Sequence, residues 1–402
     1  RSTLTGASAV TLLAQDDSVL QAVGGAVAIG LNGNGFGGAL GWNSVTNNIR
    51  AYIEDSSLTG ITGEVSVTAK SSEDDGLLDG KISSAAIGAA GSTNTSVGGA
   101  LAINGIINKV DAHITNSTVH GTGNLSVQAL DTSSIKSLTG GAAISIGGTG
   151  VGIGLSANFI ANEITATILN SDVMCTAGSV LVNADEGASI NSVAIGLGGG
   201  TGNAVAGSAT VSVIVNTVEA SIAGAAMVQA AGNVRVKSNN GAHATTIAGQ
   251  LAVSGGTSVG AAITNVTIVN NTKAWIDGRA TVAANASVGG SFTDATGRTG
   301  IRGVSIEASS PKDVQIFAIG GSVGASNGIA GSFSVTVIDD TTEAFVSSPG
   351  ASTAGSITSG GDVNVVSVSG FDLIGAAGAV AIGGTAGIGV GVDVGVATIS
   401  NR

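Results

Sequence analysis

One short phrase recurs along the chain at a nearly constant interval. It reads Asn-x-Val/Ile-x-Ala-x-Ile, and its clearest copies are residues 108–114, 162–168 and 216–222. The central alanine falls at positions 51, 112, 166, 220, 274, 344 and 397, so three successive intervals are 54 residues. A second phrase, Gly-x-Val-x-Val-x-Ala, follows these copies, as at residues 178–184. This regularity indicates a repeat protein, in which each unit contacts mainly its neighbours.

The residues within each repeat alternate with the period of two that is typical of strands. Val193, Ile195 and Leu197 form such a run, and the Gly-rich stretch 198–203 then predicts a turn. A second run, Ala209 to Val215, changes phase at Asn216. We predict a corner there, because asparagine tolerates the left-handed conformation. The equivalent corner positions are Asn47, Asn108, Asn162, Asn216, Asn270, Asp340 and Asp393.

The composition agrees with thin layers of strands. The chain has 66 glycines, only two prolines and 2% aromatic residues, although 43% of its residues are hydrophobic. We therefore predict an all-β parallel β-solenoid with repeats of about 54 residues, continuous over residues 1–402. Both ends fall inside repeats, which suggests a segment of a longer chain. The approximate repeats are 1–14 (partial), 15–69, 70–129, 130–184, 185–238, 239–308, 309–367 and 368–402 (partial).

The number of coils in each repeat stays open at this point. One repeat could be a single wide, flattened coil, two coils of about 27 residues or three of about 18. The wide coil is favoured, because an unbroken phrase normally recurs once per turn. In that arrangement Asn108, Asn162, Asn216 and Asn270 stack directly and could form a ladder of side-chain amides.

Insertions interrupt the regular spacing in three units. They lie near the acidic cluster Glu73, Asp74, Asp75 and Asp79, within residues 289–300, and near residues 347–350. The acidic cluster is a weak candidate for a cation site with oxygen ligands, although a solvated loop is the commoner form of such a run. Because the insertions mostly follow the short strand, we expect them on one face of the solenoid, where specificity would reside.

Few residues suggest catalytic chemistry. The Gly-x-Gly strings lack the context of a nucleotide-binding motif, so no catalytic or cofactor-binding residue and no cofactor is predicted. Charged residues are 10% of the chain and the net charge is −12, which argues against nucleic acid as a partner. Residues 373–392 are uncharged, but seven of the 20 are glycine, so we expect no membrane span in this segment.

The repeat text resembles that of a known class of proteins. The stretch from Ala194 through Asn216-Thr217-Val218-Glu219-Ala220 to the following Gly-x-Val-x-Val phrase is similar to the repetitive regions of giant bacterial surface proteins. The nearest are filamentous-haemagglutinin-like adhesins, including leukotoxin-family filamentous adhesins. The resemblance implies an exported protein that forms long β-solenoid stalks and mediates attachment, located outside the cell or at its surface.

These observations together predict a structural or adhesive segment of a fibre-forming surface protein, and not an enzyme. An apolar outer surface of small residues would let like chains associate laterally or end to end. A host or surface glycan or protein is a further possible partner. The alternatives are a β-helical polysaccharide-active enzyme, which would need acidic residues lining a groove, and a ligand-binding solenoid such as an ice-binding protein.

Overall fold

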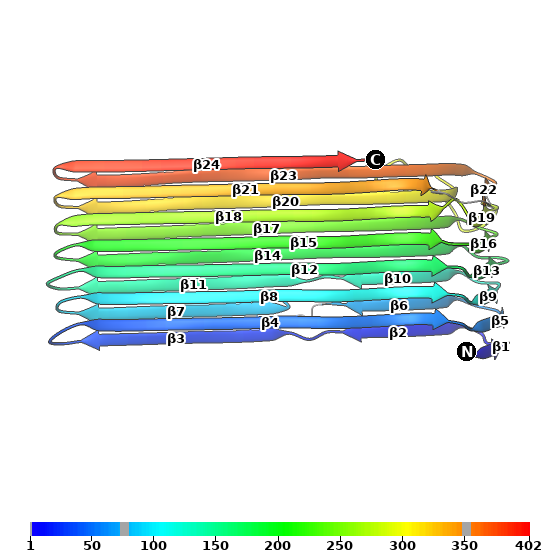
Figure 1. Cartoon of the computed structure of the whole chain (residues 1–402), viewed down its shortest axis with the longest axis horizontal. Helices are drawn as coiled ribbons and strands as arrows, with labels where there is room; N and C mark the ends of the chain where they lie inside the picture. Colours follow the sequence, from blue (N-terminus) through cyan, green and yellow to red (C-terminus); the bar gives the residue numbers. More distant parts are fainter. Residues whose placement is uncertain (1, 73–79, 348–354) are drawn as a thin grey trace.

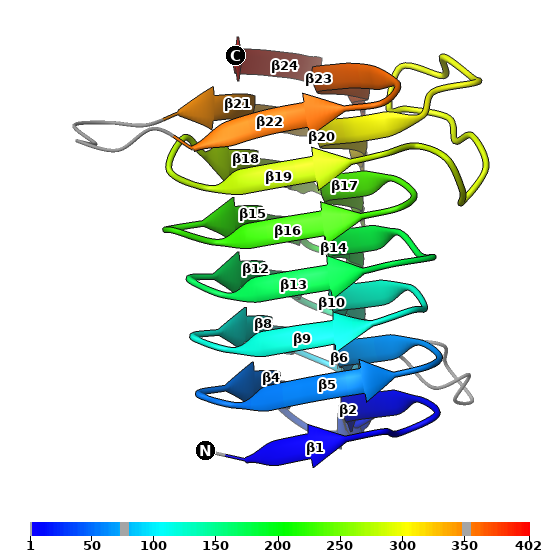
Figure 2. The same ribbon diagram turned by 90° about the vertical axis from the view of Figure 1, so that its right-hand side faces the viewer.

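The computed structural model describes residues 2–72, 80–347 and 355–402 and contains strands without helices in these ranges. The all-β, parallel fold agrees with the prediction: strands stack into three sheets that run the length of the molecule (Figures 1 and 2). The acidic candidates Glu73, Asp74, Asp75 and Asp79 lie outside the described residues, as does most of the insertion at 347–350.

Three sheets form each coil: a short end sheet and two long walls. The end sheet comprises β1 (Thr3–Thr5), β5 (Ser57–Ile61), β9 (Thr118–Gly121), β13 (Asp172–Cys175), β16 (Met227–Ala230), β19 (Thr281–Ala284) and β22 (Ser356–Ser359). The first wall comprises β2 (Val10–Asp16), β3 (Leu20–Gly30), β6 (Val65–Ser71), β7 (Ile82–Ser92), β10 (Leu125–Asp131), β11 (Ser134–Ser145), β14 (Val180–Gly200), β17 (Val234–Ser254), β20 (Gly303–Gly324) and β23 (Asp362–Gly383). The second wall comprises β4 (Gly35–Glu54), β8 (Ser96–Thr115), β12 (Gly150–Leu169), β15 (Ala204–Ala223), β18 (Thr257–Asp277), β21 (Asn327–Ser347) and β24 (Ala386–Asn401).

The chain makes one wide turn per coil. It passes along the end sheet, then the first wall, and returns along the second wall after a Gly-rich turn that we call the tip (Figure 1). The strand register pairs Asn108 with Asn162, Asn162 with Asn216, and Asn216 with Asn270. Residues 54 apart are therefore lateral neighbours in this part of the chain, which is the single wide coil rather than two or three smaller ones.

The predicted asparagine corners are wrong in position. Asn108, Asn162 and Asn216 lie inside uninterrupted strands of the second wall, with their side chains buried. The turn occurs eight residues later, where Asp55, Asn116, Asn170 and Gly224 all have positive φ. The principle that asparagine favours the left-handed region was therefore correct. The corner was assigned to the wrong position of the repeat. The apolar residues change strand face at Asn216, and this change was interpreted as a bend of the chain.

Asp393 does not belong to the row of predicted corner residues. It lies opposite Ser334, whose hydroxyl donates a hydrogen bond to it, while Ile399 occupies the place opposite Asp340. The register of β24 is set at the tip, where Ala386 pairs with Asn327. The phrase at 393–399 is therefore a chance copy in a low-complexity stretch, shifted by six residues.

The two halves of the coil are packed in different ways. Near the end sheet, the three sheets enclose a core of Val, Ile and Ala side chains such as Val127, Ile168 and Val228. Beyond this core only the two walls remain. Their inward residues are first isoleucines such as Ile190 and Ile214 and then, nearer the tip, mostly glycine, alanine and serine. We call this two-layer half the blade. Near the tip the larger apolar side chains point outward.

The blade is thin because the two walls touch through their backbones. A Cβ atom at Gly196 on the first wall would lie 2.0 Å from the carbonyl oxygen of Gly207 on the second. No side chain fits in that space, so only glycine is accommodated. Strand alternation therefore continues without a phase change, and the valines of β15 before Asn216 are placed on the outer face.

A row of buried polar side chains separates the core of the end-sheet half from the blade. Asn162 donates from Nδ2 to Asp131 (2.8 Å) and to Glu186 (3.0 Å), and Asn216 also donates to Glu186 (3.2 Å). The predicted ladder of side-chain amides is absent between Asn108 and Asn162, where the Asn108 backbone amide donates to the Asn162 side-chain oxygen Oδ1 (2.9 Å). We call this row the polar spine. Its described members include Asn47, Ser71, Lys81, Asn108, Asp131, Asn162, Glu186, Asn216, Asn270, Ser310, Lys312 and Asp340.

Glu186 makes the stability of the polar spine dependent on pH. Burial, together with the neighbouring Asp131 and Asp185 carboxylates, raises the pKa of Glu186 well above its usual value. The folded chain therefore holds this proton more tightly than the unfolded chain does. The contribution of Glu186 is complete below the pKa of an exposed glutamate and is lost as the pH rises toward the folded-state pKa.

We expect Glu186→Gln to remove this loss. Denaturant midpoints measured from pH 4 to pH 8 should fall for the natural chain and fall less for the variant, because glutamine keeps the two amide hydrogen bonds without a proton to lose. Glu163→Gln, on the exposed face of β12, is the matched control and should leave the profile unchanged. Parallel profiles for the natural chain and Glu186→Gln would contradict the assignment.

Candidate functional site

The insertion between β19 and β20 is a folded loop. A bridge joins Phe292 and Ile301 through two backbone hydrogen bonds of 3.0 and 3.2 Å. Inside it, the Asp294 carboxylate accepts from the Thr296 amide and hydroxyl and from the Arg298 amide (2.6–3.0 Å). Burial would raise the pKa of Asp294, but these hydrogen bonds outweigh it and hold the pKa below its usual value.

This loop is attached to the outer face of the first wall by an ion-pair cluster. Arg235 lies 4.1 Å from the centre of the Phe292 ring and pairs with Glu307 at 3.1 Å. The other oxygen of Glu307 accepts from the Ala295 amide at 3.1 Å. Because Glu307 is nearly fully buried, it connects the loop to the wall by charge-assisted bonds that water does not screen.

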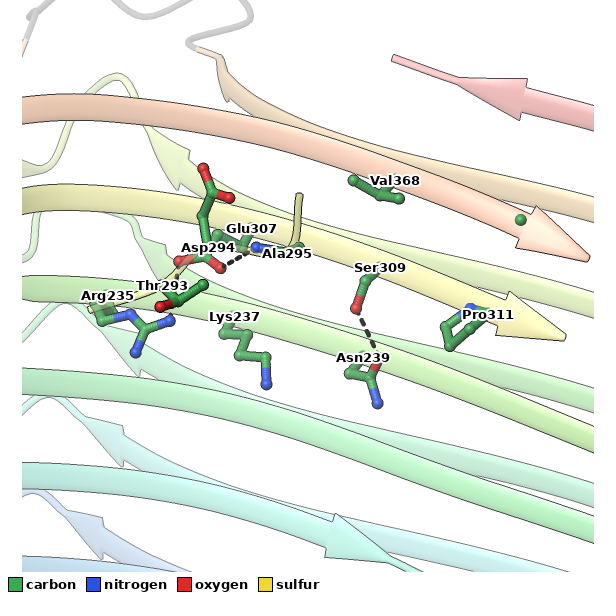
Figure 3. A pocket seen from close by; sticks show the side chains of 11 residues that line it. Arg235, Lys237, Asn239, Thr293, Asp294, Ala295, Glu307, Ser309, Pro311 and Val368 are labelled. Atoms are coloured by element: carbon green, nitrogen blue, oxygen red, sulfur yellow. Dashed lines mark hydrogen bonds and ion pairs between the residues drawn. The ribbon is translucent and has the colours of Figure 1, made fainter. Parts of the chain in front are cut away.

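The loop and the wall enclose a pocket of about 390 Å³ on the outer face of the first wall. Figure 3 shows Lys237 between the Arg235–Glu307 pair and a second pair, in which Ser309 donates to Asn239 at 2.6 Å. Within the described residues the Lys237 ammonium has no ion pair or hydrogen bond, and the buried Arg235 Nε has no acceptor. The Arg235 Nε atom is covered by protein atoms, so Lys237 is the cationic donor left for a ligand.

A second hollow of about 490 Å³ adjoins this pocket at Pro311. Its floor is low because Gly187 and Gly241 are paired on neighbouring strands and point outward without side chains. His243 and Asp313 form its rim, 3.1 Å apart. The two hollows together form an extended depression, which we call the wall groove.

The sequence predicted the importance of residues 289–300 but not their partners. Arg235, Lys237 and Glu307 carry no distinctive motif, and they meet the loop only because coils stack. The expectation that most insertions follow the short strand, at one place in the repeat, is wrong. They fall between β6 and β7, between β19 and β20, and between β21 and β22, which are three different junctions of the coil.

The remaining chemistry of the described residues is limited. Among them, no group of three His, Cys, Asp or Glu side chains is placed to hold a metal ion. No helix in the described ranges is long and apolar enough to cross a membrane. Burial raises the pKa of Cys175 to about 11, so this thiol is protected in the folded chain and its labelling reports opening of the end-sheet half.

Comparison of the chain with family models, with curated proteins and with solved structures finds no match. The fold and the wall groove are therefore the observations from which function is inferred.

Proposed function

We propose that this chain is a structural and adhesive segment of a large bacterial surface or fibre-forming protein. In this proposal the stacked coils form a rigid scaffold outside the cell, and the wall groove displays a binding site for a surface glycan. The unbroken parallel register of the second wall, from β4 to β24, is the observation that carries the scaffold role.

The scaffold role is supported by bonds between coils at several depths. Asn43, Asn104 and Asn158 form an amide ladder with two hydrogen bonds of 2.8 Å. The polar spine adds bonds across the middle of the coil, including the buried pair of Lys312 and Asp340 at 3.0 Å. Each coil is thus bonded to its neighbours across its whole width, which suits a load-bearing repeat.

The adhesive role is supported by an unused donor of the wall groove. Lys237 lines a pocket that the Ser309–Asn239 pair keeps in shape. A cationic donor beside amide and hydroxyl groups suits a carboxylate-bearing sugar chain, because hydrogen bonds to a charged group are the stronger kind. We therefore propose an acidic glycan, such as a polymer of uronic acids, as the ligand.

A polysaccharide-active enzyme is the less favoured alternative. Glycoside hydrolysis needs one protonated and one available carboxylate beside the sugar. The two carboxylates nearest the pocket, Asp294 and Glu307, are each occupied by hydrogen bonds that hold the loop. Their present bonds favour binding over catalysis at this place.

The glycan site can be tested with hexuronate oligosaccharides as the probe. We expect the natural chain to bind them and Lys237→Met to weaken binding by about tenfold, which corresponds to one charge-assisted hydrogen bond. Lys273→Met, on the second wall, removes the same charge elsewhere and should bind as the natural chain does. Equal weakening by both variants, or no binding by the natural chain, would refute the site.

Electron microscopy and fibre diffraction of the native material test the scaffold separately. We expect uniform filaments by microscopy. We expect an axial repeat of about 4.8 Å by diffraction, since that is the spacing of hydrogen-bonded strands. Discrete globular particles would refute the scaffold role.

A further inference from the structure

The outer face of the second wall carries an extended apolar surface. We call it the apolar band and define it as the outward residues of 36–46, 97–107, 151–161, 205–215, 259–269, 329–339 and 388–398. In these strands the only charged residue of the band is Asp339, at its border. Near its centre, Val211 and Ile263 are 40% and 46% exposed.

The band is a consequence of the way the blade is built. Near the tip the walls meet through glycine, alanine and serine, so the larger aliphatic side chains have no space inside and are placed outside. Leu155 and Phe159 on β12 and Phe333 on β21 are examples, each about two-fifths exposed. Exposed surface of this kind is costly in water and marks an interaction face.

The dimensions of the band match a stable contact between two proteins. Eleven residues of strand span about 36 Å, and seven strands span about 34 Å, which gives a face of about 1,200 Å². Two such faces would bury about 2,400 Å² in total. This exceeds the roughly 1,600 Å² of a standard interface and lies in the range of permanent homodimers.

We propose that a second copy of this chain covers the apolar band, so that two second walls pack face to face. This inference rests on the proposed scaffold role and names the surface through which like chains associate. A copy presents the same strand spacing, so a two-fold arrangement makes the surface complementary to itself. Polar residues such as Lys109, Glu163 and Lys273 follow the band toward the end sheet, and they provide the polar rim of a typical interface.

Analytical ultracentrifugation of the whole chain tests this proposal. We expect a dimer at micromolar concentration, and at least 100-fold weaker association for Val211→Lys with Ile263→Lys. The matched control is Leu197→Lys with Leu251→Lys, which adds the same charge to equally exposed positions on the first wall and should remain dimeric. Circular dichroism and protection of the Cys175 thiol check that each variant is folded.

Three results would overturn the proposal: a monomeric natural chain at 100 micromolar, equal dissociation of both double variants, or no effect of either. Flotation with phosphatidylcholine vesicles, lost only in the second-wall variant, would assign the band to lipid and also overturn it. None of these results would remove filaments from native material or hexuronate binding from the wall groove, so the scaffold proposal is tested independently.

Discussion

Replacing Gly196 by alanine is expected to destabilise the blade by about 3 kcal/mol or more, at the upper end of the cost of overpacking. The added methyl group would lie 2.0 Å from the carbonyl oxygen of Gly207. Neither wall can move aside easily, because β14 and β15 are each hydrogen-bonded to a strand on both sides. A lower denaturant midpoint by circular dichroism is the expected observation.

Gly207→Ala is the matched control for this prediction. Gly207 lies across from Gly196, but its Cβ would point outward and come no nearer than 3.7 Å to the Ile153 side chain. Alanine there should be neutral or stabilising by up to about 1 kcal/mol, through a smaller entropy of the unfolded chain. Equal destabilisation by both substitutions would show that the contact between the walls is not what limits the blade.

Removing the carboxylate of Asp340 is expected to cost about 3–5 kcal/mol, the usual penalty for an uncompensated buried charge. Asp340 pairs with Lys312 at 3.0 Å, and both side chains are fully buried. Burial, partly opposed by Asp340, lowers the pKa of Lys312. Without Asp340 the neutral form of the Lys312 amine is favoured further. The loss of unfolding free energy in Asp340→Ala should therefore become smaller as the pH rises toward the pKa of an exposed lysine.

The exposed pair of Lys109 and Glu163 provides the comparison for that experiment. Its atoms are 2.8 Å apart, on neighbouring coils, but both side chains are about half exposed. Glu163→Ala should therefore cost less than about 1 kcal/mol and show no dependence on alkaline pH. A similar cost for Asp340→Ala and Glu163→Ala, measured by denaturant unfolding from pH 7 to pH 10, would contradict the role of burial.

Much of the fold could be predicted from the repeated phrases. Asn108, Asn162 and Asn216 occupy equivalent positions in the text, and the sheets pair them because identical side chains fit best in register. Where the repeat sequence has diverged, pairing residues by their position in the phrase gave a wrong register. Asp393 starts a plausible copy of the phrase, yet the tip turn places it beside Ser334.

The wall groove could be predicted only in part. Extra residues at 289–300 indicated an inserted loop, but not the surface on which it folds. Lys237 and Glu307 are 70 residues apart in the chain and become neighbours because β17 pairs with β20. This proximity depends on the path of the chain around the coil, which cannot be predicted from local sequence patterns.

The sequence by itself determined that this chain is all-β and that its strands stack in parallel, because alternation and repetition are local properties of the text. Only the tertiary structure decided which face of each strand is buried. Alternation of Val with Gly or Ala is equally compatible with either side facing inward. Near the end sheet three sheets leave room for Val and Ile inside, whereas near the tip two touching walls leave room for little more than glycine and place the larger side chains on the outer face.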